Sequence, residues 1–484
     1  MGLVTPVDPV PLAELGRVHF VAVGGAGMSG IARIMLARGI AVSGCDSTAS
    51  RQLEELAVLG ARVGVGHSAD HLATADTLVV SSAIRPDNPE VAAASASGMR
   101  VLHRAAALAS VMLDRQGIAV AGTHGKTTTT GMITTVLRRC GADPGYVIGG
   151  ILAESGLGAE DGGGQAFVAE ADESDGSFLM LAPDAAVVTC VEADHLDNYA
   201  GLAEIEAAFE AFAGRITPGG LLVTCADDPG AAKLAAAARA RPGSAGTLRI
   251  VTYGESEAAD YRLVAIRPTG MATEFDLAPG RGSVLAGSAP ARLRVEVPGR
   301  HNALNAAAAY AIAAELGFAG GDIAAGLAGY RGTQRRMELK GEADSVRVLD
   351  SYAHHPTEIA ADLAAARDIA AGGRVLVVFQ PHLYSRTRIF AGEFGTALGP
   401  ADEIFVLDVY AAREDPEPGV SGALIADAVP GGRGTFWPDR RSLPRAIADR
   451  AKPGDVVLTM GAGDVTQLGP QIVAALGARA DGGG

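Results

Sequence analysis

The sequence predicts an α/β protein of three domains, each built on a mostly parallel β-sheet. Three observations lead to this fold class. The chain has 484 residues, which is too long for a single hydrophobic core. Short apolar runs that end in glycine or polar residues recur along it, and helical patterns follow them, as in α/β units with parallel strands. These runs also fall into three groups.

The predicted strands can be taken in chain order. The first group lies at 17–25, 40–46 and 76–84, the second at 117–125, 165–172, 184–195 and 219–228, and the third at 345–353, 374–382, 402–410 and 455–463. The gaps between the groups predict an N-terminal domain over residues 1–113, a central domain over 114–338 and a C-terminal domain over 339–484.

Composition narrows the classes of function. The chain is 48% hydrophobic and 20% charged, and its net charge of -15 makes it a poor general binder of nucleic acid or of anionic membranes. No apolar stretch approaches the ~20 residues of a membrane helix, and the N-terminus lacks a signal-peptide pattern. Cysteines occur at four scattered positions without a CxxC pair, which favours core residues in a reducing compartment. We therefore expect a cytoplasmic protein.

A glycine-rich loop follows the first predicted strand. Gly25-x-Gly27-x-x-Gly30 lies between that strand and a helix, where backbone N–H groups can receive a diphosphate. Asp46 ends the next strand, at the distance expected for a residue that binds ribose hydroxyls. The motif alone does not distinguish NAD, FAD or a nucleotide sugar, and a tight turn without a ligand would look the same.

A second glycine loop, AGTHGKTTTT at 121–130, predicts an ATP site. A Walker A loop would place glycine at position 120, where this chain has Val120, so the loop is shorter than usual. Its backbone amides, the Lys126 ammonium and the Thr127 hydroxyl still supply what a phosphate and Mg²⁺ need. Only four of the 40 Lys and Arg residues are lysines, so a lysine inside this loop favours a functional role.

Acidic clusters end the next two strands of the second group. One lies in VAEADESD, with Glu170 as its first member, and the other in VEADHLDNY, which includes His195. Open α/β sheets bind ligands at the carboxyl ends of their strands, and carboxylate oxygens are suitable Mg²⁺ ligands. Either cluster alone resembles a solvated loop, but together they predict a magnesium site beside the phosphate loop.

Together these segments resemble the Mur ligase family. Eight motifs in order carry the resemblance, and it covers essentially the whole chain: HFVAVGGAGMSGIA (19–32), AGTHGKTTTT (121–130), AEADESDGSFL (169–179), EADHLDNY (192–199), GRHNALNAAAA (299–309), GTQRRMELKG (332–341), DSYAHHPTEI (350–359) and FQPHLYSRTR (379–388). The resemblance implies a Rossmann-like N-terminal domain that binds UDP, a P-loop ATPase-like central domain and a Rossmann-like C-terminal domain.

The resemblance also implies an activity. It is the ATP-dependent ligation of L-alanine to the lactyl carboxylate of UDP-N-acetylmuramate through an acyl phosphate, in the synthesis of peptidoglycan precursors. ATP and Mg²⁺ would be the cofactors, with UDP-N-acetylmuramate and L-alanine as partners. Nucleic acid and membrane insertion are not expected, and the protein would be a monomer or a homodimer. The alternative is the related ligase that attaches a recycled murein tripeptide to the same UDP-sugar.

Site residues follow from the matching motifs. The implied UDP-sugar contacts are Gly25, Gly27, Gly30, Asp46, His67 and Ser82. The implied ATP contacts are Gly122, Thr123, His124, Gly125, Lys126, Thr127, Thr128, Asn302, Asn305 and Arg336. The implied metal ligands are Thr127, Glu170 and His195. The implied amino-acid contacts are His355, His382 and Arg386. The implied catalytic residues are Lys126, His195, Arg336, Asp350 and His355.

Some of these residues have simpler alternative roles, and two positions differ from the motifs of the family. Asn302 and Asn305 could cap and line a helix, and Arg335 cannot be told from Arg336 locally. Ser351 follows Asp350 where relatives often have a second aspartate, and Leu383 replaces an arginine found in some relatives.

Overall fold

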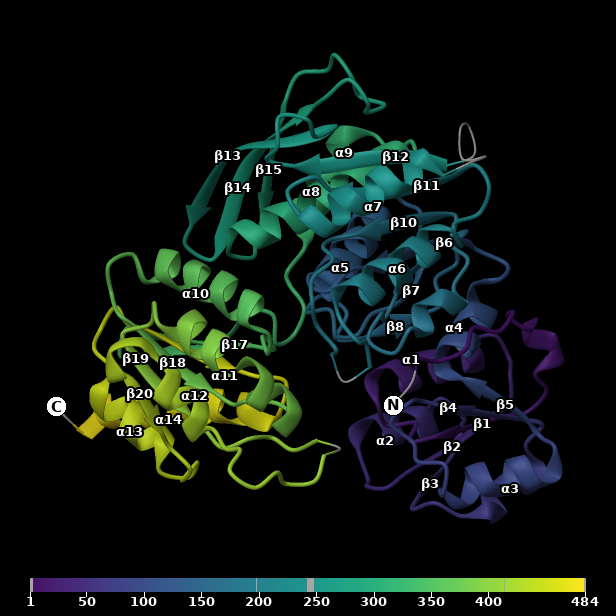
Figure 1. Ribbon diagram of the computed structural model, residues 1–484, viewed down its shortest axis with the longest axis horizontal. Coiled ribbons are helices and arrows are strands. Elements are labelled where there is room, and N and C mark those ends of the chain that lie inside the picture. The colour runs from purple at the N-terminus through teal and green to yellow at the C-terminus, as the bar shows by residue number, and fades with distance from the viewer. Residues whose placement is uncertain (1–2, 197, 242–247, 413, 483–484) are drawn as a thin grey trace. The chain divides into compact units, whose positions relative to one another are not determined.

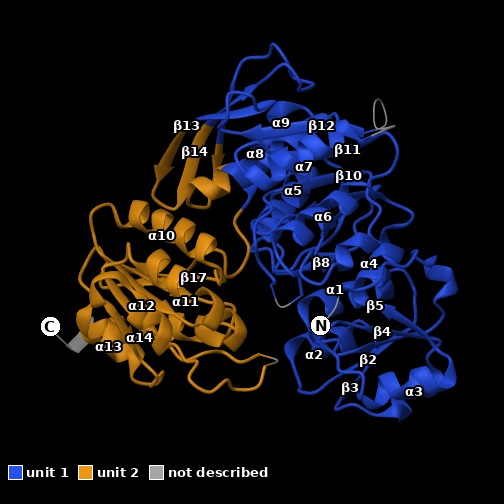
Figure 2. Ribbon diagram, in the orientation of Figure 1, with its two compact units in different colours: residues 1–264, 276–293, 304–330 blue, residues 265–275, 294–303, 331–484 orange. Residues whose placement is uncertain are grey.

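The computed structural model describes residues 3–196, 198–241, 248–412 and 414–482 and contains three mostly parallel β-sheets (Figure 1). The predicted α/β class is therefore confirmed. By contacts between residues, the chain divides into two compact units (Figure 2). Unit 1 comprises residues 1–264, 276–293 and 304–330, and unit 2 comprises 265–275, 294–303 and 331–484. The predicted domain boundaries after residues 113 and 338 stay predictions.

The first sheet has five strands in the order β3-β2-β1-β4-β5, and each neighbouring pair is parallel. Its strands are β1 (Val18–Val21), β2 (Val42–Asp46), β3 (Arg62–Val65), β4 (Thr77–Val80) and β5 (Arg100–His103). The four residues of β1 are all buried, as expected for the central strand of a sheet covered on both faces. This order reverses beside β1, which places the first glycine loop at a switch point where α/β proteins bind ligands.

Local signals define the helices around this sheet. They are α1 (Ala26–Ala37), α2 (Arg51–Val58), α3 (Pro89–Ser97) and α4 (Arg104–Met112), with short 3₁₀ turns η1 (Leu12–Glu14) and η2 (Ala69–Thr74). The Asn88 side chain caps α3 before a proline in its first turn, and Gly98 ends that helix in the left-handed conformation.

The second sheet has ten strands in the order β15-β14-β13-β12-β11-β10-β6-β9-β7-β8. They are β6 (Gln116–Ala121), β7 (Gly145–Val147), β8 (Ala159–Glu160), β9 (Ala166–Glu170), β10 (Ala185–Val188), β11 (Gly220–Cys225), β12 (Leu248–Gly254), β13 (Tyr261–Thr269), β14 (Ala272–Pro279) and β15 (Ala291–Val295). Strand β6 pairs in parallel with both β9 and β10. The phosphate loop after β6 therefore lies between the two acidic strand ends.

Helices and one 3₁₀ turn accompany the second sheet in the chain. They are α5 (Lys126–Arg139), η3 (Ser177–Met180), α6 (Leu202–Ala213), α7 (Pro229–Ala240), α8 (Arg300–Glu315) and α9 (Gly320–Gly329). Eleven of the fourteen residues of α5 are buried. The helix that begins at Lys126 is thus held inside unit 1, which fixes the direction of its N-terminus.

The third sheet lies in unit 2 and has the order β16-β17-β21-β18-β19-β20. Its strands are β16 (Glu338–Ala343), β17 (Val346–Ser351), β18 (Val375–Phe379), β19 (Glu403–Val406), β20 (Gly434–Phe436) and β21 (Val456–Met460). Its helices are α10 (Pro356–Ala370), α11 (Tyr384–Leu398), α12 (Ala423–Ala428), α13 (Leu443–Arg450) and α14 (Leu468–Gly482), with 3₁₀ turns η4 (Pro430–Gly432) and η5 (Asp464–Gln467).

Alternation along β18 produces two hydrophobic cores in unit 2. Val377 and Phe379 pack in one core with residues of α10, α11 and α12, whereas Leu376 and Val378 pack in the other with residues of α13 and α14. A strand that is apolar on both faces reads as a continuous hydrophobic run. Among the residues described, no helix is both long and apolar enough to span a bilayer.

Candidate active site

The phosphate loop has a backbone that only glycine can adopt at two positions. Gly122 has φ +131°, and a Cβ there would lie 2.0 Å from the hydroxyl oxygen of Thr189. Gly125 has φ +81°, and a Cβ there would lie 2.7 Å from Oδ1 of Asn305. Both neighbours belong to unit 1. The loop is therefore compressed against the end of β10 and against α8, and no side chain fits at either glycine.

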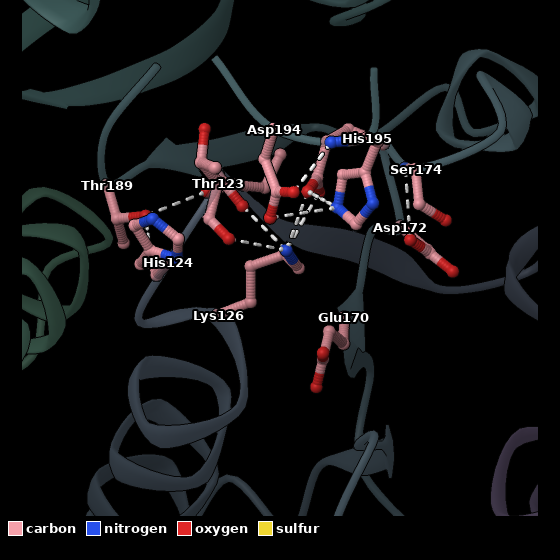
Figure 3. A network of polar contacts seen from close by, with 12 residues as sticks. Thr123, His124, Lys126, Glu170, Asp172, Ser174, Thr189, Asp194 and His195 are labelled. Carbon is pink, nitrogen blue, oxygen red and sulfur yellow. Dashed lines mark hydrogen bonds and ion pairs between the residues drawn. The ribbon is translucent and has the colours of Figure 1, made fainter. Parts of the chain in front are cut away.

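Residues that follow β10 hold the loop in place. The Thr123 amide donates to the Cys190 carbonyl (3.0 Å), and the His124 amide donates to the Cys190 sulfur (3.2 Å). The Glu192 amide in turn donates to the Thr123 hydroxyl (2.9 Å). Thr189 bonds the carbonyl of His124 (Figure 3). These contacts orient the loop without using the amides at the start of α5, where an anion is stabilised by the helix dipole.

Lys126 points into this loop. Its ammonium donates to the carbonyls of Gly122 (2.7 Å) and Thr123 (3.2 Å) and to Oε1 of Glu173 (2.9 Å). Glu173 is 2% exposed, so the ion pair is shielded from water. Burial opposes the charge of Lys126, but Glu173 and neighbouring carboxylates raise its pKa above the ordinary value. The lysine is therefore a fixed positive charge at the position where a phosphate would bind.

Glu170 and Thr127 meet on the other side of the lysine. The Thr127 hydroxyl donates to Oε1 of Glu170 (3.1 Å), and the Gly149 amide donates to Oε2 (2.7 Å). Figure 3 shows the Glu170 side chain apart from the network around the Lys126 ammonium. A hydroxyl and a carboxylate beside a helix N-terminus are hard oxygen donors of the kind that Mg²⁺ prefers. These two predicted metal ligands fit the ion.

His195 joins the same network from the end of the next strand. Its Nε2 lies 3.3 Å from Oε1 of Glu173 and 3.7 Å from Oδ2 of Asp194. Burial opposes protonation, yet the hydrogen bond with Glu173 and the charge of Asp194 raise the pKa of His195. Its backbone φ of +53° is unusual for a residue with a side chain. Such strain concentrates where the surrounding structure positions a functional group.

Each of the three glycines in the first glycine loop has different surroundings. Gly25 precedes α1 as its N-cap, and a Cβ on Gly27 would lie 3.1 Å from Nη1 of Arg104. A Cβ on Gly30 would lie 2.9 Å from the Cβ of Ala159, so this glycine permits close packing. The Asp46 carboxylate accepts a hydrogen bond from the Gly24 amide (3.0 Å). Asp46 is thereby fixed beside the loop, where the sequence placed a ribose contact.

The two remaining predicted UDP-sugar residues have protein partners. Nδ1 of His67 lies 3.1 Å from both Sγ of Cys45 and Oε2 of Glu90. The Ser82 hydroxyl lies 3.0 Å from Nε2 of His103 and also bonds Asp175. Their roles toward a ligand stay predictions.

In unit 2, Asp350 is fully buried at the end of β17. Its carboxylate accepts hydrogen bonds from the hydroxyls of Thr459 (2.7 Å) and Thr466 (2.7 Å). Nε of Arg335 lies 3.4 Å from Oδ2 of Asp350, whereas Nη1 of Arg336 lies 3.6 Å from Oε1 of Glu358. The structure thus separates the two arginines that local sequence could not distinguish. Arg335 pairs with Asp350, and Arg336 faces α10.

The predicted amino-acid contacts lie at the starts of two helices of unit 2. His355 caps α10 through its Nδ1, which accepts from the Thr357 amide (3.4 Å), and its ring packs edge-on against Phe390. The ring of His382 stacks on Tyr410, with centroids 5.9 Å apart. Arg386 is 8% exposed in the first turn of α11. Leu383 precedes that helix with φ +71°.

Asn302 and Asn305 both lie in α8, one turn apart. Nδ2 of Asn302 donates to the Pro298 carbonyl (2.7 Å) just before the helix, and its proposed contact with ATP stays a prediction. Asn305 reaches the phosphate loop at Gly125.

Three family models match consecutive parts of this chain. The Mur ligase family catalytic domain matches residues 17–116, the Mur ligase middle domain matches 120–313, and the Mur ligase glutamate ligase domain matches 335–463. The chain belongs to the Mur ligase family.

Several relatives resemble this Mur ligase over almost their full length. The UDP-N-acetylmuramate–L-alanine ligase of Thermobifida fusca is 56% identical over 99% of this chain and 100% of its own. The protein of the same name from Kineococcus radiotolerans is 54% identical over 97% and 98%. Among solved structures, UDP-N-acetylmuramate-alanine ligase from Thermotoga maritima has a TM-score of 0.78 at 28% identity, covering 97% of this chain and 100% of that one.

A murein peptide ligase from Psychrobacter arcticus has a TM-score of 0.70 at 24% identity, covering 96% of this chain and 99% of that one. At that identity the likeness shows a shared fold.

Arg104 was not among the residues that sequence reasoning singled out in this Mur ligase. Arg104, at the start of α4, forms an ion pair with Asp172 and lies beside Gly27. A cavity of about 190 Å³ in unit 1 is lined by these three residues and by Glu170, among others. It therefore connects the first glycine loop with the end of β9. The only local signal was a cation directly after a strand, which did not distinguish Arg104 from other surface arginines.

Proposed function

We propose that the chain joins L-alanine to the lactyl carboxylate of UDP-N-acetylmuramate at the expense of ATP. The observation that carries the proposal is the phosphate loop with Lys126 at its centre and Glu170 beside Thr127. The cavity from Gly27 to Glu170 offers a route by which a substrate on the first loop reaches that centre. Relatives that are 50–56% identical carry the name of this ligase, which supports the choice of substrates.

In this proposal the phosphates of ATP bind at the N-terminus of α5. The amides of the loop and the dipole of α5 receive the anionic oxygens. Lys126 exchanges its contacts with Glu173 and the loop carbonyls for the terminal phosphate. Because the lysine is buried, its charge acts in a medium of low dielectric and stabilises the transferred phosphoryl group more than it would in water. Asn305, beside Gly125, is a proposed contact of the same nucleotide.

Thr127 and Glu170 would hold Mg²⁺, with His195 as a further proposed ligand. The ion, when bound, neutralises charge on the phosphate oxygens during transfer. Before the ligands bind, Glu173 contacts both Lys126 and His195 and so holds these two side chains in position.

The first glycine loop would bind the diphosphate of UDP-N-acetylmuramate, with Asp46 oriented toward ribose by its bond to the Gly24 amide. Arg104 lies in the cavity that leads from this loop to Glu170, where it would guide the lactyl carboxylate. The carboxylate attacks the γ-phosphate, which gives an acyl phosphate and ADP. The amine of L-alanine then attacks the acyl carbon, the amide forms and inorganic phosphate leaves.

Unit 2 supplies the proposed contacts of the amino acid, which are His355, His382 and Arg386. A guanidinium pairs well with a carboxylate, so Arg386 is the proposed partner of the alanine carboxylate. The ammonium group of alanine must lose a proton before it attacks, and His195 and His355 are the candidate bases.

Phosphate release measured with purified full-length protein tests the proposal. ATP, Mg²⁺ and UDP-N-acetylmuramate should give sustained phosphate release only when L-alanine is added, with one amide formed per phosphate. Equal turnover without an amino acid, or without the UDP-sugar, would contradict the ligase reaction.

The same assay separates the two ligases that share the UDP-sugar. L-alanine should support a much higher kcat/KM than the tripeptide L-alanyl-γ-D-glutamyl-meso-diaminopimelate. A higher value for the tripeptide would replace alanine ligation by tripeptide ligation.

A further inference from the structure

A cluster of nitrogen, sulfur and oxygen donors is buried in the first sheet, outside the proposed reaction centre. His19 comes from β1, Cys45 from β2, His71 from η2 and Glu90 from α3. Figure 1 labels β1, β2 and α3. One donor atom of each residue lies within 4.8 Å of the others. His19 is 2% exposed, and Cys45 and Glu90 are fully buried.

Glu90 is a buried carboxylate whose described side-chain contacts are three histidines and a cysteine. Its oxygens lie 3.1 Å from Sγ of Cys45, 2.6 Å from Nδ1 of His71 and 3.4 Å from Nε2 of His19. An ionised carboxylate in an apolar interior normally needs a cation. A divalent cation bound between Glu90 and the thiolate of Cys45 would balance both negative charges.

One ring nitrogen of His19 faces Glu90 without forming a hydrogen bond to it. Its Nδ1 is engaged by the Ser43 hydroxyl (2.9 Å), whereas its buried Nε2 has no hydrogen-bond partner. That nitrogen is aimed at Glu90. A metal-bound histidine characteristically holds its second ring nitrogen in such a hydrogen bond, which fixes the tautomer and the ring orientation.

We propose that His19, Cys45, His71 and Glu90 form a structural site for Zn²⁺ in the first sheet. Two imidazoles, one thiolate and one carboxylate suit Zn²⁺, whereas Mg²⁺ and Ca²⁺ prefer oxygen ligands alone. Tetrahedral bonds of about 2.0 to 2.3 Å place donors roughly 3.3 to 3.7 Å apart, so the contacts of Glu90 open by about 1 Å or less on binding. The thiol of Cys45 releases its proton to solvent when it becomes a ligand.

A metal ion can reach the site from solvent, and once bound it would connect several elements of the first sheet. The side chains of His71 and His67 are 30% and 23% exposed, so the cluster is reached from solvent on their side. The ion would join β1, β2, η2 and α3. None of the four ligands is among the proposed ligase contacts, although His67, an implied UDP-sugar contact, touches Cys45 and Glu90.

Metal titration of the full-length protein tests the proposal. After removal of metals by EDTA and exchange into buffer with a non-chelating reductant, Zn²⁺ is titrated against a chromophoric chelator. Co²⁺ is titrated separately, because a thiolate ligand gives it a near-ultraviolet charge-transfer band. We expect one Zn²⁺ per chain and a Co²⁺–thiolate band. Cys45→Ser should abolish the band and weaken the affinity for Zn²⁺ by more than about 100-fold, since loss of a residue that only hydrogen-bonds a metal ligand already costs about 10- to 100-fold.

Cys225→Ser is the matched control, because Cys225 is also a buried free cysteine of unit 1 but ends strand β11. It should keep both the stoichiometry and the band. Ser43→Ala, which frees Nδ1 of His19, should weaken Zn²⁺ by about 10- to 100-fold. If Cys45→Ser does not fold, His71→Gln at the more exposed edge replaces it and should weaken Zn²⁺ by the same order. The proposal is overturned if the wild type binds no stoichiometric Zn²⁺, or if loss of these ligands leaves affinity unchanged.

Discussion

The loop after β1 and the loop after β6 both lead glycines into the first turn of a helix, but only the second contains charged and titratable side chains. In the first loop, the nearby charges are supplied by Asp46 and Arg104 from other elements. In the second, Lys126 lies in the loop and pairs with buried Glu173. Both loops lead to a helix N-terminus that can receive an anion, and we propose that the loop with the buried lysine takes part in phosphoryl transfer whereas the first loop binds the diphosphate.

Among changes that test this difference between the loops, removal of Lys126 should have the largest effect on activity. Lys126→Ala is expected to lower kcat by about 10³-fold, because a buried charge that stabilises the transferred group is lost. Binding of UDP-N-acetylmuramate, measured by calorimetry, should stay within a factor of about two.

Lys233→Ala is the matched control, since Lys233 is a surface lysine of unit 1 paired with Glu206. It should retain wild-type turnover. Equal losses of turnover in Lys126→Ala and Lys233→Ala would contradict the proposed division of diphosphate binding and phosphoryl transfer between the two loops.

A methyl group at the tightest point of the second loop should have the next largest effect. Gly122→Ala places a Cβ 2.0 Å from the Thr189 hydroxyl at a φ that disfavours alanine. The loop must shift by about 1 Å, for which we expect an activity loss of roughly 100-fold. Activity and the thermal midpoint should both fall. Gly321→Ala in α9, where a Cβ meets nothing within 4 Å, should change neither; unchanged activity in Gly122→Ala would show that the loop is not compressed.

The first loop should tolerate a methyl group better. Gly27→Ala brings a Cβ to 3.1 Å from the end of the Arg104 side chain, which can move by a few tenths of an ångström. A cost of about 1 kcal/mol corresponds to roughly a fivefold rise in KM for UDP-N-acetylmuramate, with little change in kcat. Steady-state kinetics distinguish the two parameters. Gly477→Ala in α14 serves as the control, and a fall in kcat as large as that of Gly122→Ala would remove the distinction between the loops.

The smallest effect concerns two histidines. Their pKa values should be shifted in opposite directions from the ordinary value. Burial lowers the pKa of His103, whereas Glu173 raises the pKa of His195 against the effect of burial. Imidazole NMR at pH 6.5 in metal-free protein should find His103 mostly neutral and His195 mostly protonated, with assignments from His103→Gln and His195→Gln. A common midpoint for both would contradict the electrostatic contrast.

The two pKa shifts should also give the free energy of unfolding opposite dependences on pH. The pKa of His103 is lowered in the folded state. Its contribution to the free energy of unfolding is therefore present above its unfolded pKa of about 6.5 and is lost as pH falls through its folded pKa. A raised pKa means that the contribution of His195 is present below that unfolded value and is lost as pH rises through its folded pKa. Urea unfolding between pH 5 and 8 measures both slopes, and each glutamine variant should remove its own.

The sequence by itself determined the α/β class, the two glycine loops and the acidic strand ends. These features depend on local properties, namely the period of apolar residues, the freedom of glycine and the position of a residue at a strand terminus. Lys126 and Glu170 could be selected as site residues for that reason. Motif order was also sufficient for the resemblance to Mur ligases.

Only the tertiary structure decided which distant groups meet. Strand β6 lies between β9 and β10, and this order places Glu173 on Lys126 and Thr189 against Gly122. Arg104 reaches Gly27, and Arg335 rather than Arg336 pairs with Asp350, a difference that the local sequence left open. Local patterns specify the elements, but contacts between residues far apart in the chain depend on strand order and on burial, which no single segment encodes.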